Sequence, residues 1–245
     1  NEMVAVLDVY FNDAPVIKNA DAKVGEQVKL NIHSRNALNG MAIGNTDFTI
    51  TMDNGRRRDG LTTGFSDTSN GEMQFDGVGY IAGQVYRGVT DANGDATIIL
   101  TQDKGVGLLT PLNITPVDSL ISTPISRSVK FTVATSPDTA KAKMWGHMAD
   151  TITVGDWTFE RPKLAGEVSN PLRTQDESNE TWTRVAHTDA ASNPEAGGCA
   201  ANRLPRIDQL EALYNANSGG KINGIQGWPV YLNYWSSTFQ SASTW

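Results

Sequence analysis

Two stretches decide the fold of the C-terminal part of this chain: Arg203-Leu204-Pro205-Arg206-Ile207-Asp208-Gln209-Leu210-Glu211-Ala212-Leu213-Tyr214 and Gly227-Trp228-Pro229-Val230-Tyr231-Leu232-Asn233-Tyr234-Trp235-Ser236-Ser237-Thr238. The first predicts a helix from Arg206 to Asn215, because its expected core residues recur at spacings of three and four: Ile207, Leu210, Leu213 and Tyr214. Pro205 suits the first turn of that helix, and Gly219-Gly220 follows its end. The second stretch predicts an aromatic strand. Neither stretch carries the residue pairs of a hydrolase or a transferase, which favours recognition.

The N-terminal half is patterned as strands, with no sustained helical period before residue 135. Apolar and polar residues alternate in these segments: Met3 to Phe11, Gln27 to Ile32, Phe48 to Met52, Tyr80 to Tyr86, Ala96 to Thr101 and Val129 to Val133. Asx/Gly clusters such as Asp53-Asn54-Gly55 and Asp91-Ala92-Asn93-Gly94 separate them as turns. An all-β, immunoglobulin-like sandwich is therefore predicted.

The C-terminal half predicts a different architecture. Strands are expected over Thr151 to Val154, Trp157 to Arg161 and Thr181 to Ala186, before the helix and the aromatic strand. This order is α+β. The joint is expected near Thr135-Ser136-Pro137-Asp138, which gives domains at residues 1–136 and 137–245.

Composition excludes several classes of partner. The chain has 245 residues, with 20 basic against 27 acidic side chains and a net charge of −7. The only cluster of positively charged residues in the sequence is Arg56-Arg57-Arg58, so nucleic acid is not an expected partner. No apolar run approaches the roughly 18 residues of a membrane-spanning helix, so the fragment itself is not expected to insert into a membrane.

No catalytic residue, cofactor site or metal site is predicted, and the chain is not expected to be an enzyme. His33, His147 and His187 are scattered, without metal-ligand spacing, and no Gly-x-Ser-x-Gly motif occurs. Asp91-Ala92-Asn93-Gly94-Asp95 begins like a calcium loop, but its twelfth position is Gln102 where a bidentate acid is required. A hairpin turn is the prediction for this run.

Cys199 is the one cysteine of the chain. It is either a buried, free thiol or half of a disulfide whose partner lies outside the chain. The abrupt end at Trp245, just after a strand-like segment, favours the disulfide.

These motifs together resemble a known family. Arg203 to Leu213 and Trp235 to Thr238 resemble the C-type-lectin-like domain that caps the intimin and invasin adhesins of bacteria. Val89 to Thr101 is similar to a turn and strand of the immunoglobulin-like repeats in the same family. The resemblance implies an immunoglobulin-like sandwich followed by a C-type-lectin-like domain that lacks its C-terminal strands, with Trp235 in the core. It also implies that Trp145 and Met148 pack at the junction of the two domains. The carboxylate motifs of calcium-dependent lectins are missing, so no calcium is expected.

The resemblance also implies a function. The parent protein would be anchored in the bacterial outer membrane, with this fragment extracellular and at its outward end. The lectin-like tip would bind a host protein such as an integrin, another receptor or an antibody, and the first domain would be a stiff spacer. The alternatives are a metal-independent carbohydrate-binding module and a passive stalk or cap.

The contact surface is expected in loops of the tip, at Lys221, Asn223, Gln226, Trp228 and Tyr231. Trp228 and Tyr231 flank Pro229 and are the aromatic pair expected to face solvent, where such residues form protein-binding hot spots. The alternative is that this loop covers the core of its own domain.

Overall fold

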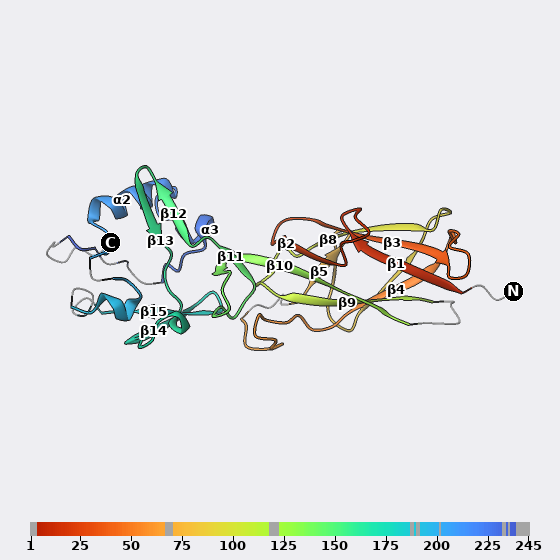
Figure 1. Ribbon diagram of the computed structural model, residues 1–245, viewed down its shortest axis with the longest axis horizontal. Coiled ribbons are helices and arrows are strands. Elements are labelled where there is room, and N and C mark those ends of the chain that lie inside the picture. Colours follow the sequence, from red (N-terminus) through yellow and green to blue (C-terminus); the bar gives the residue numbers. More distant parts are fainter. Residues whose placement is uncertain are drawn as a thin grey trace. The chain divides into compact units, whose positions relative to one another are not determined.

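A computed structural model describes residues 4–66, 71–117, 123–186, 189, 192–200, 202–231, 234 and 236–238 (Figure 1). The chain divides into two compact units, Asn1–Thr132 and Val133–Trp245. Each unit has an apolar core of its own. A separate core is the main physical requirement for a domain that folds independently.

The first unit contains two β-sheets (Figure 1, red to yellow-green). One is antiparallel and contains, in spatial order, β1 (Ala5–Phe11), β3 (Val28–Asn36), β8 (Asp95–Thr101), β5 (Met73–Phe75) and β6 (Val78–Tyr80). The other has β10 (Ile125–Pro137), β9 (Leu109–Pro116), β4 (Asp47–Met52) and β7 (Val85–Val89) in order, with β2 (Asn19–Lys23) parallel to β10.

Buried and more exposed side chains alternate along the strands, and the buried ones form the core between these sheets. In β9 every second residue is buried, so one face of the strand points inward and the other does not. Both sheets contribute aromatic and aliphatic side chains to one cluster, whose largest members are Phe11, Phe48, Phe75, Phe131 and Leu30. This is the sandwich that the alternating sequence predicts.

The predicted strand from Tyr80 to Tyr86 is wrong. Tyr80 ends β6 in the first sheet, whereas Tyr86 lies in β7 of the second sheet. A turn separates them, closed by a hydrogen bond from Gln84 N to Ile81 O (3.1 Å) and containing Gly83 at φ 88°. The segment breaks because the chain changes sheets here, while both tyrosine rings still contact Phe75 in the shared core.

The Asp91–Asp95 run forms a tight turn, but the predicted hairpin is wrong, because the turn joins β7 of one sheet to β8 of the other. The Asp91 carboxylate accepts hydrogen bonds from the backbone N–H groups of Asn93 (2.8 Å) and Asp95 (2.9 Å). Gly94 adopts φ 83°, a conformation that glycine tolerates best. The side chain that would begin a calcium loop therefore stabilises the turn itself.

The second unit combines short strands and helices (Figure 1, green to blue). Its strands are β11 (Gly146–Met148), parallel to the end of β10, and the hairpins β12 (Thr151–Val154) with β13 (Trp157–Glu160) and β14 (Arg173–Glu177) with β15 (Glu180–Arg184). Its helices are η1 (Ala165–Glu167), η2 (Pro194–Gly197), α2 (Ile207–Ala216) and α3 (Ile222–Gln226).

The predicted helix is present as α2, but its faces differ from expectation. Leu213 is buried and Ile207 and Leu210 are half-buried, whereas Tyr214 is exposed and lies beside Gly219 and Gly220. The predicted core role of Tyr214 is therefore wrong. Its ring instead covers the glycine-rich exit from the helix.

The predicted aromatic strand is also wrong for the residues that the structure describes. Residues 227–230 have no strand conformation, and the short helix α3 precedes them. Trp235, expected in the core, lies outside the described residues. Met148 belongs to the core of the second unit, together with Trp182, Leu164 and Ile152.

Candidate functional site

Residues 221–231 contain the predicted contact residues and are here called the recognition segment. The segment begins at the N-cap of α3, and the chain turns sharply after this helix. Gly227 ends the helix with φ 78°. A Cβ atom at this position would lie 1.8 Å from the Ala134 carbonyl oxygen, so only glycine fits. This close approach fixes the direction in which the chain continues to Trp228.

Trp228 is an internal anchor of the recognition segment. It is only 3% exposed and packs in the core of the second unit, and its carbonyl accepts a hydrogen bond from Asn223 Nδ2 (2.9 Å). The expectation that Trp228 faces solvent is therefore wrong, because its large apolar ring stabilises the core instead. Asn223 also has an internal role through the same hydrogen bond.

The two residues that follow Pro229 are held by a distant carboxylate. Glu177 Oε1 accepts the backbone N–H of Val230 (2.9 Å), and its Oε2 accepts that of Tyr231 (3.0 Å). Hydrogen bonds to a charged acceptor are stronger than neutral ones. The backbone is thereby fixed while the Tyr231 side chain remains 74% exposed and Val230 48% exposed.

Glu177 reaches this position because it ends a tight hairpin. Ser178 (φ 52°) and Asn179 (φ 63°) form the two-residue connection between β14 and β15, and both are left-handed, as a type I′ turn requires. Sequence reasoning missed Glu177, since it lies 53 residues from Val230 and no local pattern connects them.

The remaining predicted residues are placed as follows. Lys221 is exposed at the N-cap of α3, and Gln226 is half-buried at its last turn. Ile225, which was not predicted, is an exposed apolar residue on the same helix. The exposed part of the recognition segment thus contains one cation, Lys221, and three large side chains, Ile225, Val230 and Tyr231.

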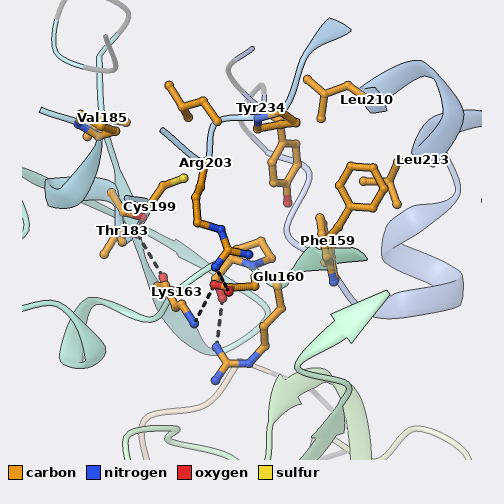
Figure 2. Close-up of a pocket in the computed structure, with 18 of the residues that line it drawn as sticks. Phe159, Glu160, Lys163, Thr183, Val185, Cys199, Arg203, Leu210, Leu213 and Tyr234 are labelled. Carbon is orange, nitrogen blue, oxygen red and sulfur yellow. Dashed lines mark hydrogen bonds and ion pairs between the residues drawn. The ribbon is translucent and has the colours of Figure 1, made fainter. Parts of the chain in front are cut away.

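A cavity of about 1180 Å³ lies within the second unit, between β13, β15, α2 and the chain around Cys199 (Figure 2). Figure 2 shows Arg203 and Lys163 converging on Glu160 at its wall: Arg203 Nη1 is 3.1 Å from Glu160 Oε1, and Lys163 Nζ is 3.8 Å from Glu160 Oε2. Tyr234 lies on another wall, and its hydroxyl donates to the Pro229 carbonyl. Burial raises the pKa of Tyr234, and the Glu177 charge acts in the same direction.

Cys199 lines this cavity as a half-buried free thiol. Burial raises its pKa; the nearby Arg203 lowers it and Glu160 raises it further, and the net change is upward. The thiol therefore stays protonated at neutral pH, which makes it a poor nucleophile. A disulfide with a cysteine outside the chain remains a prediction.

Of the three histidines of the chain, the two that the structure describes lie in different units. In the first unit, His33 Nδ1 is hydrogen-bonded to Asp95 Oδ1 at 2.7 Å. His147 is in the second unit, and His187 lies outside the described residues. No group of three or more His, Cys, Asp or Glu side chains that could bind a metal occurs among the described residues. Within the same residues, no helix has the length and apolar character to span a membrane.

Comparison with known proteins assigns both units. Residues 137–245 match the family model of the InvE adhesion domain, and residues 25–134 match that of bacterial immunoglobulin-like domain 21. The solved structure of the Yersinia pseudotuberculosis adhesin InvE is 29% identical, with a TM-score of 0.78 over 98% of this chain. The chain belongs to the invasin/intimin family of adhesins.

This adhesin spans 61% of the length of the InvE structure. The D00–D0 domain of intimin is another similar structure, at 15% identity and a TM-score of 0.34, covering 54% of this adhesin and 49% of that chain. No curated protein sequence gives a significant match. The immunoglobulin-like character of the first unit agrees with the predicted sandwich.

Proposed function

We propose that this adhesin binds a host surface protein through the recognition segment of its second unit, and that the immunoglobulin-like unit acts as a spacer. The observation that carries the proposal is the pair of hydrogen bonds that the Glu177 carboxylate accepts from the backbone N–H groups of Val230 and Tyr231. It holds an exposed tyrosine in place before any partner arrives. Such pre-organisation reduces the conformational entropy lost on binding.

The chemistry of the exposed residues fits a protein partner. Tyrosine is among the residues that most often dominate the binding energy of protein interfaces. In the described part of the chain, the side chain of Tyr231 makes no hydrogen bond and is exposed. Val230 and Ile225 add apolar surface, and Lys221 and Gln226 supply polar groups for a rim.

Family membership supports finer proposals as well. The second unit would have a C-type-lectin-like fold, with Cys199 paired to a cysteine outside the chain. The parent protein would be anchored in the bacterial outer membrane and displayed outside the cell.

A passive stalk or cap is the competing function, and it predicts no specific affinity of the second unit for host cells.

The test measures adherence of beads coated with the 245-residue chain to cultured mammalian cells, before and after trypsin treatment of the cells. Tyr231→Ala should reduce adherence about tenfold or more, because it removes a hot-spot side chain without opening the core. Glu177→Gln should reduce it less, since Tyr231 remains but is held less firmly. Tyr214→Ala, which truncates an exposed tyrosine on α2, is the matched control and should leave adherence unchanged.

Unchanged adherence of Tyr231→Ala would remove the recognition segment from the interface. Adherence that survives trypsin but is lost after glycosidase treatment would contradict a protein partner. Equal and low adherence of all variants and of uncoated beads would favour a passive stalk.

A further inference from the structure

The hairpin of β14 and β15 has a free outer edge. Among the described strands, β14 has only β15 as a neighbour, in a two-stranded sheet (Figure 1). In an antiparallel pair, residues that bond the neighbouring strand alternate with residues whose N–H and C=O groups point outward. A row of such outward groups is a template for a strand of another chain.

The turn fixes which residues of β14 point outward. Glu177 flanks the two-residue turn, so it and every second residue before it bond β15. Thr174 and Asp176 lie between these residues, and both are exposed. Thr183, opposite Thr174, donates its N–H away from β14, to the Lys163 carbonyl (3.0 Å), as this alternation requires. The backbone N–H groups of Thr174 and Asp176 therefore face the free edge.

The same hairpin places like charges opposite each other. Arg173 is opposite Arg184, and Glu177 is opposite Glu180. Like charges directly across two strands destabilise the pair. Glu180 is buried and accepts hydrogen bonds within its own unit. Arg173 and Arg184 are exposed and form no ion pair with any residue that the structure describes, so the basic end of the hairpin lacks a negative neighbour.

We propose that β14 pairs antiparallel with β14 of a second copy of this chain, about a twofold axis at the middle of the strand. The strand reads Arg173-Thr174-Gln175-Asp176-Glu177, which is self-complementary in this register. Arg173 lies opposite Glu177 of the second copy at each end of the pair. Thr174 lies opposite Asp176 of the second copy, and the two exchange backbone hydrogen bonds.

The remaining acceptors of β14 allow this pairing. The Asp176 carbonyl already accepts a hydrogen bond from Gln175 Nε2 (3.2 Å), but a carbonyl oxygen has a second lone pair. The Glu177 carboxylate accepts two backbone N–H groups of the recognition segment. A carboxylate has about four acceptor sites, so Glu177 can also bind a guanidinium.

The charge pattern favours a second copy over an unrelated strand. A foreign strand has no fixed charges, whereas a second copy always brings an acidic residue to Arg173 and a basic one to Glu177. The edge strand β7 offers a contrast. Its central residue is the exposed Arg87, and two copies of β7 paired about that residue would place two arginines opposite each other.

The dimer would also bring two recognition segments together. The two Glu177 residues would lie four positions apart along the paired strands, or about 14 Å. Each would still hold the backbone of its own recognition segment. Two linked binding segments increase the apparent affinity for a host assembly that presents two sites. This consequence rests on the proposed function, whereas the dimer itself does not.

Sedimentation equilibrium of the 245-residue chain measures the dimer directly. The contact between two five-residue strands is small, so we expect a dissociation constant of about 10–500 μM. Arg173→Glu should weaken dimerisation about tenfold or more, because it places two acidic residues opposite each other at both ends. An equimolar mixture of Arg173→Glu and Glu177→Arg should dimerise again, since each acidic residue then faces a basic one. Arg87→Glu is the matched control and should change nothing.

Cross-linking tests the register. In a Cys199→Ser background, Gln175→Cys should form a disulfide-linked dimer under mild oxidation, because the two residues would face each other with Cα atoms about 4.5 Å apart. Thr174→Cys is the control. Its two copies would lie roughly 8 Å apart, beyond the roughly 7 Å that a disulfide allows.

A chain that stays monomeric up to about 1 mM would overturn the proposal and leave the edge open to a strand of another protein. A dimer that Arg173→Glu does not weaken would overturn it too, as would equal cross-linking of Gln175→Cys and Thr174→Cys. If Glu177→Arg does not fold, Arg173→Glu and the cross-links decide. Tyr231→Ala should dimerise like the unaltered chain, so loss of host binding and loss of the dimer are distinguishable.

Discussion

Glu177 and Glu180 flank the same two-residue turn but use their carboxylates differently. Glu177 fixes the recognition segment, whereas Glu180 is only 1% exposed and fixes the start of the second unit. Its carboxylate accepts hydrogen bonds from Ser136 Oγ (2.7 Å) and from the backbone N–H groups of Lys143 (2.7 Å) and Met144 (3.0 Å). A buried carboxylate is stable only when its oxygens are satisfied in this way.

Glu180→Gln is expected to destabilise the second unit by about 2–4 kcal/mol, because an amide has one acceptor oxygen and presents donors to the N–H groups. Urea unfolding followed by tryptophan fluorescence measures this, since every tryptophan of the chain lies at residue 145 or beyond. Glu211→Gln, at an exposed position of α2, should change stability by less than about 0.5 kcal/mol. A similarly small change for Glu180→Gln would show that the buried charge is not needed.

At the scale of the elements, η1 is held by an ion-pair network around the buried side chain of Arg161. Arg161 Nη2 is 2.7 Å from Glu167 Oε1, and Arg161 Nε is 3.0 Å from Asp150 Oδ1. Burial alone raises the pKa of Glu167, but the hydrogen bonds from Arg161 and from the Leu164 amide and the Arg161 charge outweigh it. The net pKa lies below the ordinary value of 4.5.

A pKa that is lower in the folded than in the unfolded state has a definite consequence for stability. The Glu167 carboxylate stabilises the fold above its unfolded pKa, and that stabilisation is lost as the pH falls through the lower, folded pKa. We expect Glu167→Gln to destabilise the second unit by roughly 1–3 kcal/mol near pH 7 and by less near pH 3. Urea midpoints at the two pH values, followed by tryptophan fluorescence, give the comparison. An equal loss at both would exclude this ionisation as the cause.

The elements also differ in how far sequence patterns can specify them. Helix α2 and strands β1, β3, β4, β8 and β10 follow from periodicity, because each has one face in a core. Strand β9 is not predicted from the sequence, because Pro111 and Pro116 are residues that usually interrupt a strand. Both prolines nevertheless lie within it. Segment 80–86 alternates like a strand but crosses between sheets, which only the surrounding packing requires.

At the scale of the molecule, the core cluster of the first unit consists, among the residues that the structure describes, only of residues up to Phe131. The unit therefore contains all the apolar contacts that its own core needs. We expect residues 1–135 expressed alone to fold, with a thermal midpoint by circular dichroism within about 4 °C of that of the same transition in the full chain. A shift well beyond this range, or an unfolded product, would mean that the first unit depends on the second.

The sequence by itself determined the broad organisation of this adhesin: a β-sandwich, then a mixed unit with one clear helix, and membership of its family. These follow from local periodicity, turn residues and short motifs, which act over a few neighbouring residues. Tertiary structure alone decided that Trp228 is buried, that Glu177 holds Tyr231, and that Glu160, Lys163 and Arg203 share a cavity wall. Contacts such as Glu177 with Tyr231, 54 residues apart, arise from packing that no local pattern encodes.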